Sequence, residues 1–251
     1  MAENQRRLFG LIGFPLTHSF SKTYFNRKFA AEGIDAEYLN FEIPDIGDLM
    51  EVISEYPELS GLNVTIPYKE QIMPYLDELD EDAAKIGAVN VVKCIRDGND
   101  LKLKGFNSDV IGFADSIFSL LNPARHKALI LGTGGAAKAV ARSFDKLGIE
   151  WKMVSRNERP DCLTYSELDR EVIEKHKIIV NATPVGMYPN VNAAPDIPYQ
   201  YLTSEHLCYD LLYNPDITMF MRKAKEHGAE VKNGLEMLLL QAFASWSIWN
   251  S

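Results

Sequence analysis

A glycine-rich segment gives this sequence its clearest indication of chemistry. Residues 132–137 (GTGGAA) match the pattern G-x-G-x-x-G/A, with alanine in the last place. They follow a predicted strand and open a predicted helix, which is the context that this pattern requires. Glycines permit a tight turn and let backbone N–H groups approach a pyrophosphate at the start of the helix. We therefore predict nucleotide binding here, with a purely structural turn as the alternative.

The residues after the next strand bear on the choice of nucleotide. NAD sites usually carry an acidic residue roughly 20 residues beyond the glycines. Here Arg156 stands near that place, between Ser155 and Asn157. A guanidinium suits a ribose 2′-phosphate, because it can donate paired hydrogen bonds. The pattern favours NADP over NAD, although Glu158 is acidic and a solvated turn is a further interpretation.

Polar residues also gather at predicted element boundaries in the first third of the chain. The segment NVTIPYK (63–69) follows an apolar strand and is predicted to enter a helix. Lys69 would then lie in a first helical turn, where the helix dipole disfavours a cation, which suggests a task for it. Two hydroxyls occur at Ser19 and Ser21. They suit an N-cap pair as well as a ligand site, and Asp109 likewise stands where a helix N-cap would be.

These segments need a framework of strands and helices to bring them together. Apolar strand patterns alternate with helical ones, which is typical of βαβ units and mostly parallel sheets. VNVVKCI and LKLKGF flank a turn-rich segment and predict a hairpin. We expect an α/β protein with two domains. Residues 1–106, completed by a C-terminal helix at 235–251, form the first, and residues 107–234 form a Rossmann-type second.

Composition narrows the classes of function. With 46% hydrophobic residues the chain can bury a core, which argues against an intrinsically disordered protein. A net charge of −9 disfavours general binding to nucleic acid. The sequence shows neither a signal peptide nor a membrane-spanning run, so we expect a cytoplasmic protein. Three widely spaced cysteines fit neither a disulfide framework nor a zinc site, and we predict no metal.

The order of these segments resembles the shikimate dehydrogenase family along nearly the whole chain. Each motif is weak alone, but their succession at compatible spacing is specific. The motifs are HSFS (18–21), NVTIPYK (63–69), GAVN (87–90), GFNSD (105–109), GTGGAA (132–137), SRN (155–157), NATPVGM (181–187), YNP (213–215) and NGLEMLLLQ (233–241).

The resemblance implies reversible, NADPH-dependent reduction of 3-dehydroshikimate to shikimate, a step of aromatic amino-acid biosynthesis. By similarity, Lys69 and Asp109 form the catalytic pair. The residues implied in substrate binding are Ser19 and Ser21, with Tyr213, for the carboxylate, and Thr65, Asn90, Asp109 and Gln241 for the ring hydroxyls. The residues implied in cofactor binding are Gly132, Gly134, Gly135, Ala136, Ser155, Arg156, Asn157, Thr183, Met187, Gly234 and Met237, although both methionines also suit core packing.

Three departures from the family pattern and two alternative functions stay open. Lys22 and Phe25 replace a usual proline and histidine, Ser108 replaces a threonine, and Glu236 replaces a small residue. One alternative is a quinate/shikimate dehydrogenase that uses NAD or NADP. The other is a non-catalytic nucleotide or metabolite sensor. We expect a monomer or homodimer that binds only small molecules.

Overall fold

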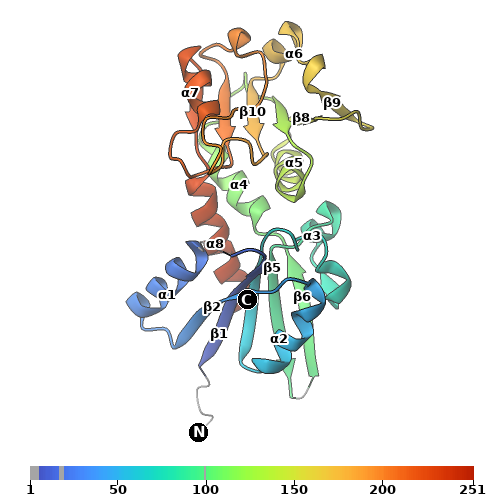
Figure 1. Cartoon of the computed structure of the whole chain (residues 1–251), viewed down its shortest axis with the longest axis vertical. Helices are drawn as coiled ribbons and strands as arrows, with labels where there is room; N and C mark the ends of the chain where they lie inside the picture. Colours follow the sequence, from blue (N-terminus) through green and yellow to red (C-terminus); the bar gives the residue numbers. More distant parts are fainter. Residues whose placement is uncertain (1–5, 17–19, 99) are drawn as a thin grey trace. The chain divides into compact units, whose positions relative to one another are not determined.

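The computed structural model describes residues 6–16, 20–98 and 100–251. The chain divides into two compact units. The first comprises residues up to Ser108 together with Ala242–Ser251, and the second comprises Asp109–Gln241. Within the described residues, each unit contains one six-stranded sheet with helices packed against it (Figure 1). The α/β fold predicted from the sequence is confirmed.

The boundaries between the units along the chain differ slightly from those predicted from the sequence. The predicted boundaries followed Phe106 and residue 234, whereas the observed ones follow Ser108 and Gln241. Helix α4 (Asp109–Phe118) thus belongs to the second unit. Helix α8 (Leu235–Asn250) begins in the second unit and ends in the first. No helix in the described part of the chain combines the length and the apolar composition that crossing a bilayer requires.

The sheet of the first unit is mixed. Its strands lie in the order β2-β1-β3-β5-β6-β4, with β1 parallel to β2 and β3, and with β5 antiparallel to β3 and β6. The predicted hairpin is β5 and β6. The strand bounds are β1 Arg7–Gly13, β2 Ala36–Glu42, β3 Leu59–Val64, β4 Glu78–Leu79, β5 Val91–Asp97 and β6 Asp100–Phe106. The helices are α1 Phe20–Glu32, α2 Leu49–Glu55 and α3 Glu81–Ile86, with short 3-10 helices η1 Ile46–Asp48 and η2 Met73–Tyr75.

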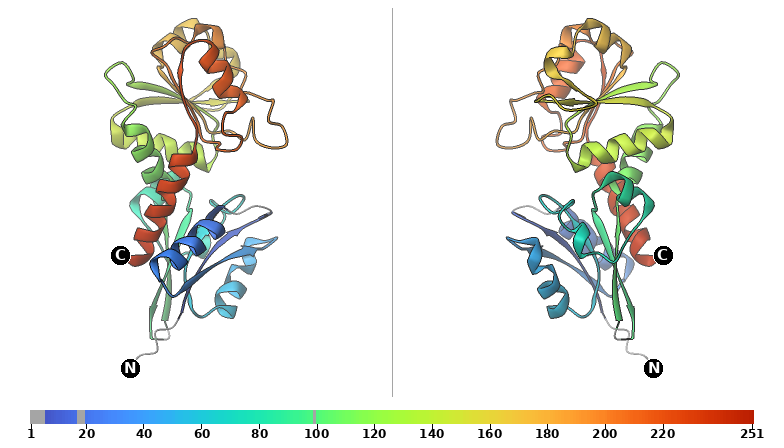
Figure 2. Two further views of the ribbon diagram at one scale, coloured as in Figure 1. Left: turned by 90° about the vertical axis from the view of Figure 1, so that its left-hand side faces the viewer. Right: turned by 90° about the vertical axis from the view of Figure 1, so that its right-hand side faces the viewer.

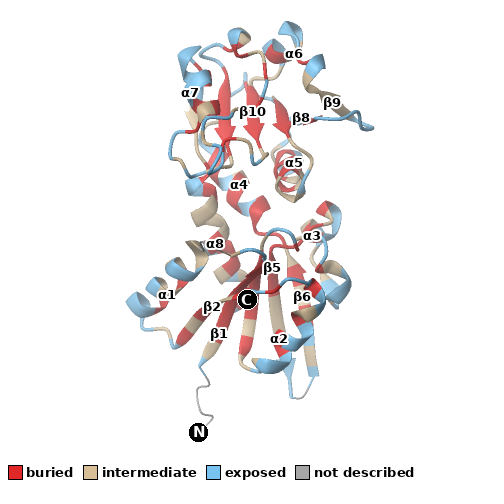
Figure 3. Cartoon of the chain, viewed as in Figure 1, coloured by how far each residue is buried: buried red, intermediate tan, exposed pale blue. Residues whose placement is uncertain are grey.

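Both faces of this sheet are covered, which explains why β1 carries no polar side chain from Leu8 to Gly13. In β1, Leu8 and Ile12 join the cluster that includes α2. Phe9 and Leu11 point to the other face, because successive side chains of a strand alternate. That second face packs on α1 and on the last turns of α8 (Figures 2 and 3). A strand buried on both faces loses the alternation of polar and apolar residues.

The end of α8 fits the first unit tightly. Trp249 is buried, and its ring centroid lies 4.7 Å from that of Phe9. Its indole N–H donates to the Val92 carbonyl at 3.0 Å. A Cβ atom on Gly61 would lie 2.3 Å from the indole nitrogen, so the indole occupies the space that a larger residue on β3 would need. The last helix is therefore part of the core of the first unit.

The helix that the sequence predicts directly after β3 is wrong. Residues 66–72 form consecutive turns, and the 3-10 helix η2 follows. The Lys69 carbonyl accepts from Val89 N at 2.7 Å, while the Met73 N–H donates to Glu70. The bond from Val89 thus takes the carbonyl that an α-helix would offer to residue 73. A helix dipole consequently gives no argument about Lys69.

The sheet of the second unit is parallel throughout, in the order β12-β11-β10-β7-β8-β9. The strand order reverses between β7 and β10, as in Rossmann-type folds. The strands are β7 Lys127–Leu131, β8 Glu150–Ser155, β9 Cys162–Thr164, β10 Ile178–Asn181, β11 Leu207–Asp210 and β12 Glu230–Lys232. Besides α4 and α8, the helices are α5 Gly135–Leu147, α6 Arg170–Lys175 and α7 Met219–Glu226, with 3-10 helices η3 Tyr165–Glu167 and η4 Tyr199–Tyr201.

Helices cover both faces of this second sheet. In β7, Ala128 and Ile130 pack with α4, α5 and the start of α8. Leu129 and Leu131 face the cluster that contains α6 and α7. Helix α5 is capped at its C-terminus by Gly148, whose left-handed conformation (φ 68°) glycine adopts without strain.

A buried carboxyl group, Asp210, fastens the loops that follow β10 and β11. Its Oδ1 accepts from Asn181 Nδ2 and from Leu212 N, each at 3.0 Å, and its Oδ2 accepts from Thr218 Oγ1 at 2.6 Å. Asn181 Oδ1 in turn accepts from Thr183 Oγ1 at 2.6 Å. Burial raises the pKa of Asp210 to about 6, because the three donors only partly offset the loss of water.

This raised pKa makes the stability of the chain depend on pH in a defined direction. An unfolded aspartate has a pKa near 3.9, so between about pH 4 and 6 the folded state binds the proton more tightly. The contribution of Asp210 to the free energy of unfolding is therefore fully present below about pH 4 and is lost as the pH rises through about 6. At about 1.4 kcal/mol per pKa unit, it amounts to about 2–3 kcal/mol.

We expect Asp210→Asn to remove this part of the pH dependence. Denaturant unfolding at pH 4 and at pH 7 gives the free energy of unfolding of variant and wild type. The difference between the two proteins should change between these pH values. Asp196→Asn, at an exposed position of the same unit, is the matched control and should leave the wild-type dependence in place. If Asp210→Asn follows the wild-type pH profile, the account of Asp210 is incorrect.

Candidate active site

Three predicted site residues of the first unit lie on two chain segments that backbone bonds hold side by side. Thr65 and Lys69 follow β3, and Asn90 precedes β5. The Val64 N–H donates to the Asn90 carbonyl at 2.8 Å, and the Val89 N–H donates to the Lys69 carbonyl at 2.7 Å. These two bonds align residues 64–69 with residues 89–90. The structure thus brings Thr65, Lys69 and Asn90 together at the carboxyl end of β3.

The orientation of the Asn90 side chain is fixed by an unambiguous donor. Its Oδ1 accepts from the backbone N–H of Ser108 at 2.7 Å, and its Nδ2 donates to Ser108 Oγ at 3.1 Å. Asn90 is 3% exposed. Since a backbone N–H can only donate, the amide oxygen must face Ser108. The NH2 group has two hydrogens, so a second one can serve a ligand acceptor.

The predicted carboxylate site is described in part. Ser19 lies outside the described residues. Ser21, in the first turn of α1, is partly buried and hydrogen-bonds the hydroxyl of Tyr38. Lys69 is also partly buried. In the second unit, Tyr213 is 41% exposed.

Asp109 and Gln241 lie near the close approach of two helices in the second unit. Asp109 is the first residue of α4 and is 7% exposed. A negative charge at this end of a helix interacts favourably with the helix dipole. A Cβ on Gly112 would lie 2.8 Å from the Met237 carbonyl and 2.9 Å from Gln241 N, so only glycine lets α4 and α8 approach this closely. Gln241 Nε2 donates to the Leu238 carbonyl at 2.9 Å.

The glycine loop has the geometry of a phosphate site. Gly132 has φ +114° and donates its N–H to the Val154 carbonyl at 2.9 Å. Gly134 is the N-cap of α5, so no side chain at that position covers the first N–H groups of the helix. A Cβ on Gly132 would come within 3.2 Å of Thr183 Cγ2. The loop and Thr183 therefore adjoin where the strand order reverses, and the predicted residues Gly135 and Ala136 form the first turn of α5. These features fit a pyrophosphate.

The predicted 2′-phosphate residues follow β8. Ser155 is buried, and its Oγ accepts from Asn157 N at 3.4 Å. Arg156 and Asn157 are exposed. Arg156 lies near Tyr165, whose pKa is raised by burial and lowered in smaller measure by the charge of Arg156. A guanidinium at the surface beyond the carboxyl end of β8 is accessible to a phosphate.

The remaining predicted cofactor residues differ in how far they are buried. Met237 is 7% exposed and packs in the core beneath α4 and α5. Met187 is 48% exposed, so core packing does not explain it. Gly234 precedes α8, and a Cβ there would lie 2.0 Å from the Leu211 carbonyl, which requires glycine.

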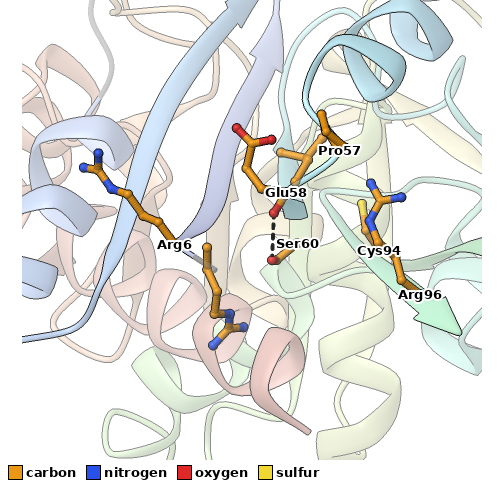
Figure 4. A pocket seen from close by; sticks show the side chains of 8 residues that line it. Arg6, Pro57, Glu58, Ser60, Cys94 and Arg96 are labelled. Atoms are coloured by element: carbon orange, nitrogen blue, oxygen red, sulfur yellow. Dashed lines mark hydrogen bonds between the residues drawn. The ribbon is translucent and has the colours of Figure 1, made fainter. Parts of the chain in front are cut away.

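A separate hollow of about 210 Å³ lies at the opposite end of the first sheet, around the beginnings of β1 and β3 (Figure 4). It contains none of the predicted site residues. The Arg6 guanidinium pairs with Glu37 at 3.2 Å, and Ser60 Oγ donates to the Glu58 carbonyl. Burial raises the pKa of the Cys94 thiol to about 12, which keeps it protonated and unreactive.

Several buried polar residues have no role in the predictions from the sequence. Asn63 and Asn181 occur in the quoted motifs but carry no predicted function, and Ser245 lies outside those motifs. A polar residue in an otherwise apolar run is the signal that marks each of them, since buried polar groups need partners.

Comparison with known proteins supports the resemblance. Residues 11–92 match the shikimate dehydrogenase substrate binding domain. The chain is 38% identical over 268 residues to the NADP-dependent shikimate dehydrogenase of Methanococcus maripaludis strain C7, covering 99% of this chain and 93% of that one.

Two solved structures have a closely similar fold. Shikimate dehydrogenase of Aquifex aeolicus is 35% identical with a TM-score of 0.85, covering 100% of this chain and 94% of that one. Shikimate 5-dehydrogenase of Thermus thermophilus, in complex with NADP(H) and shikimate, is 31% identical with a TM-score of 0.84, covering 97% and 93%. The match thus extends through both units, and the chain belongs to the shikimate dehydrogenase family.

Proposed function

We propose that this chain is an NADP-dependent oxidoreductase that reversibly reduces 3-dehydroshikimate to shikimate in the shikimate pathway. The observation that carries this function is the match over nearly full length to NADP-dependent shikimate dehydrogenases. The clustering of Thr65, Lys69 and Asn90 at the carboxyl end of β3 supports it, because this is where α/β sheets bind ligands. A cytoplasmic location and a monomeric or homodimeric state stay predictions.

The proposed chemistry needs a proton donor beside a ketone. NADPH, when bound, would supply a hydride, and hydride transfer to a ketone develops negative charge on the ketone oxygen. Lys69 donates a proton to that oxygen in reduction and accepts it in oxidation. Such general acid–base assistance is typically worth about 10²–10⁴-fold in rate. Asp109 orients the lysine and binds the neighbouring hydroxyl.

The other polar residues hold the substrate by matched hydrogen bonds. Thr65, Asn90 and Gln241 bind ring hydroxyls, and the fixed amide of Asn90 presents an N–H donor rather than its oxygen. Ser19 and Ser21, with Tyr213, bind the carboxylate. No full positive charge is among these groups, so recognition of the acid depends on hydroxyl donors.

The second unit holds the cofactor. The backbone N–H groups at the start of α5 bind the pyrophosphate, and Arg156 with Ser155 and Asn157 binds the 2′-phosphate. Thr183, Met187, Gly234 and Met237 border the nicotinamide. Gly234 and Met237 act there through the shape of the backbone and the core, because neither has an exposed side chain.

Formation of reduced nicotinamide tests the assignment directly. We expect shikimate with NADP to be the best of four pairs formed by shikimate or quinate with NADP or NAD. Turnover with quinate and NAD alone would identify a quinate dehydrogenase instead. Absence of turnover with every pair, alongside nucleotide binding, would indicate a sensor.

Replacing the proposed acid–base group should separate chemistry from binding. We expect Lys69→Ala to lower kcat by about 10²–10⁴-fold, with the KM for shikimate changed only a few-fold. Steady-state kinetics measure both constants. Lys85→Ala, which removes an exposed lysine paired with Glu81 on α3, is the control and should retain wild-type kcat. A Lys69→Ala enzyme with wild-type kcat would refute the role of Lys69.

Arg156 should determine the preference for NADP. Hydrogen bonds to charged groups typically contribute enough for about a 10- to 100-fold change in affinity. We expect Arg156→Gln to raise the KM for NADP by about that factor and to leave the KM for NAD nearly unchanged. Arg170→Gln, at an exposed position of helix α6, is the control. Equal effects on the two cofactors would contradict a 2′-phosphate contact.

A further inference from the structure

Five buried polar side chains form a continuous hydrogen-bonded chain inside the first unit. Tyr38 Oη donates to Asn63 Oδ1 at 2.8 Å, and Asn63 Nδ2 donates to Ser245 Oγ at 2.9 Å. Ser245 Oγ lies 3.2 Å from Ser108 Oγ, which accepts from Asn90 Nδ2 at 3.1 Å. None of the five is more than 6% exposed. We name this set the buried polar chain.

The direction of the hydrogen bonds is set from both ends. At one end, the backbone N–H of Ser108 holds Asn90 Oδ1, so the amide nitrogen of Asn90 is the donor to Ser108 Oγ. At the other end, Tyr38 gives its hydrogen to Asn63 Oδ1, and Asn63 Nδ2 therefore points to Ser245. In the 3.2 Å contact between Ser245 Oγ and Ser108 Oγ, either hydroxyl can be the donor.

Both ends of the buried polar chain contact proposed substrate-binding residues. Tyr38 hydrogen-bonds Ser21, and since Tyr38 donates to Asn63, the Ser21 hydroxyl is the donor in that contact. The other end is Asn90 itself. In the middle, Asn63 lies two residues before Thr65 along the same strand end. Thus residues proposed to bind the carboxylate and the ring hydroxyls are joined through one core network.

Ser245 is the link that the C-terminal helix contributes. It is fully buried on α8, between Asn63 on β3 and Ser108 after β6. Loss of its hydroxyl would take from the buried Asn63 amide the acceptor at 2.9 Å, which is costly in a low-dielectric core. Asn63 Nδ2 has a second acceptor, the Asn90 carbonyl, at a longer 3.4 Å. In a variant without this hydroxyl we expect the Asn63 amide to shift toward the Asn90 carbonyl and so to alter the position of Asn90.

We propose that Ser245 is a positioning residue of the shikimate site, which holds Asn63 and Ser108 so that Asn90 presents its N–H to the substrate. This inference rests on the proposed function. Ser245 itself does not contact the substrate. Its effect should therefore be seen in the affinity for shikimate and not in the affinity for NADP.

Three substitutions on the full chain test the role of Ser245. We expect Ser245→Ala to raise the KM for shikimate by about 3- to 10-fold, the size of one lost hydrogen bond, and to leave the KM for NADP unchanged. Ser245→Thr keeps the hydroxyl and should restore a KM within about 2-fold of wild type, although its methyl group must be accommodated. Ser247→Ala, on the exposed side of the same helix, is the control.

Tyr38→Phe gives a second, independent measurement. It removes the hydrogen that fixes Asn63 Oδ1 while it keeps the ring that stacks on Phe25. We expect the KM for shikimate to rise in this variant too, with the KM for NADP unchanged. Tyr56→Phe, at a partly buried position of the same unit, is its control.

The outcomes separate the inference from the function on which it rests. If the wild type turns over shikimate but Ser245→Ala and Tyr38→Phe lower only the Tm and leave the KM unchanged, the inference is refuted and the function stands. If Ser245→Ala does not fold, the result with Tyr38→Phe decides in the same way. A wild type without turnover of shikimate refutes both.

Discussion

Two backbone hydrogen bonds determine the arrangement of the first unit's polar residues. They join Val64 N to the Asn90 carbonyl and Val89 N to the Lys69 carbonyl. The bond from Val89 occupies the Lys69 carbonyl, which in an α-helix would accept from the N–H of residue 73. The bonds instead satisfy the backbone groups of both segments against each other, as buried backbone groups require. The same main-chain pairing therefore aligns the segments that carry Thr65, Lys69 and Asn90 at the carboxyl end of β3.

In the second unit, side chains rather than backbone groups hold the loops that follow the strands. At the ends of β10 and β11, Asn181 and Asp210 bind each other and also bind the loops that follow. Burying the charged carboxylate of Asp210 costs free energy, and its raised pKa reflects that cost. It holds Thr183 beside the glycine loop, where precise placement matters to a cofactor. The network in the first unit uses only hydroxyl and amide groups, which are neutral across the physiological pH range.

Local patterns in the sequence predicted most of the framework. Strand and helix periodicities located the alternating elements, and the glycine loop at 132–137 was predicted together with its strand and helix, because its conformation depends on adjacent residues. The turn at Lys69 was not predicted, since a bond from residue 89 overrides the local helical preference. Ser245 was missed for a related reason. Its partner Asn63 is 182 residues away, and no local rule connects them.

Helix α8 constrains the order in which the two units can complete their folding during synthesis. The core of the first unit includes Trp249, which fills the space over Gly61, and the buried polar chain includes Ser245. Both residues follow the entire second unit in the sequence. During synthesis, the second unit has its whole sequence before the first unit has its last helix. The substrate-binding half therefore reaches its final packing after the nucleotide-binding half has been made, although it comes first from the ribosome.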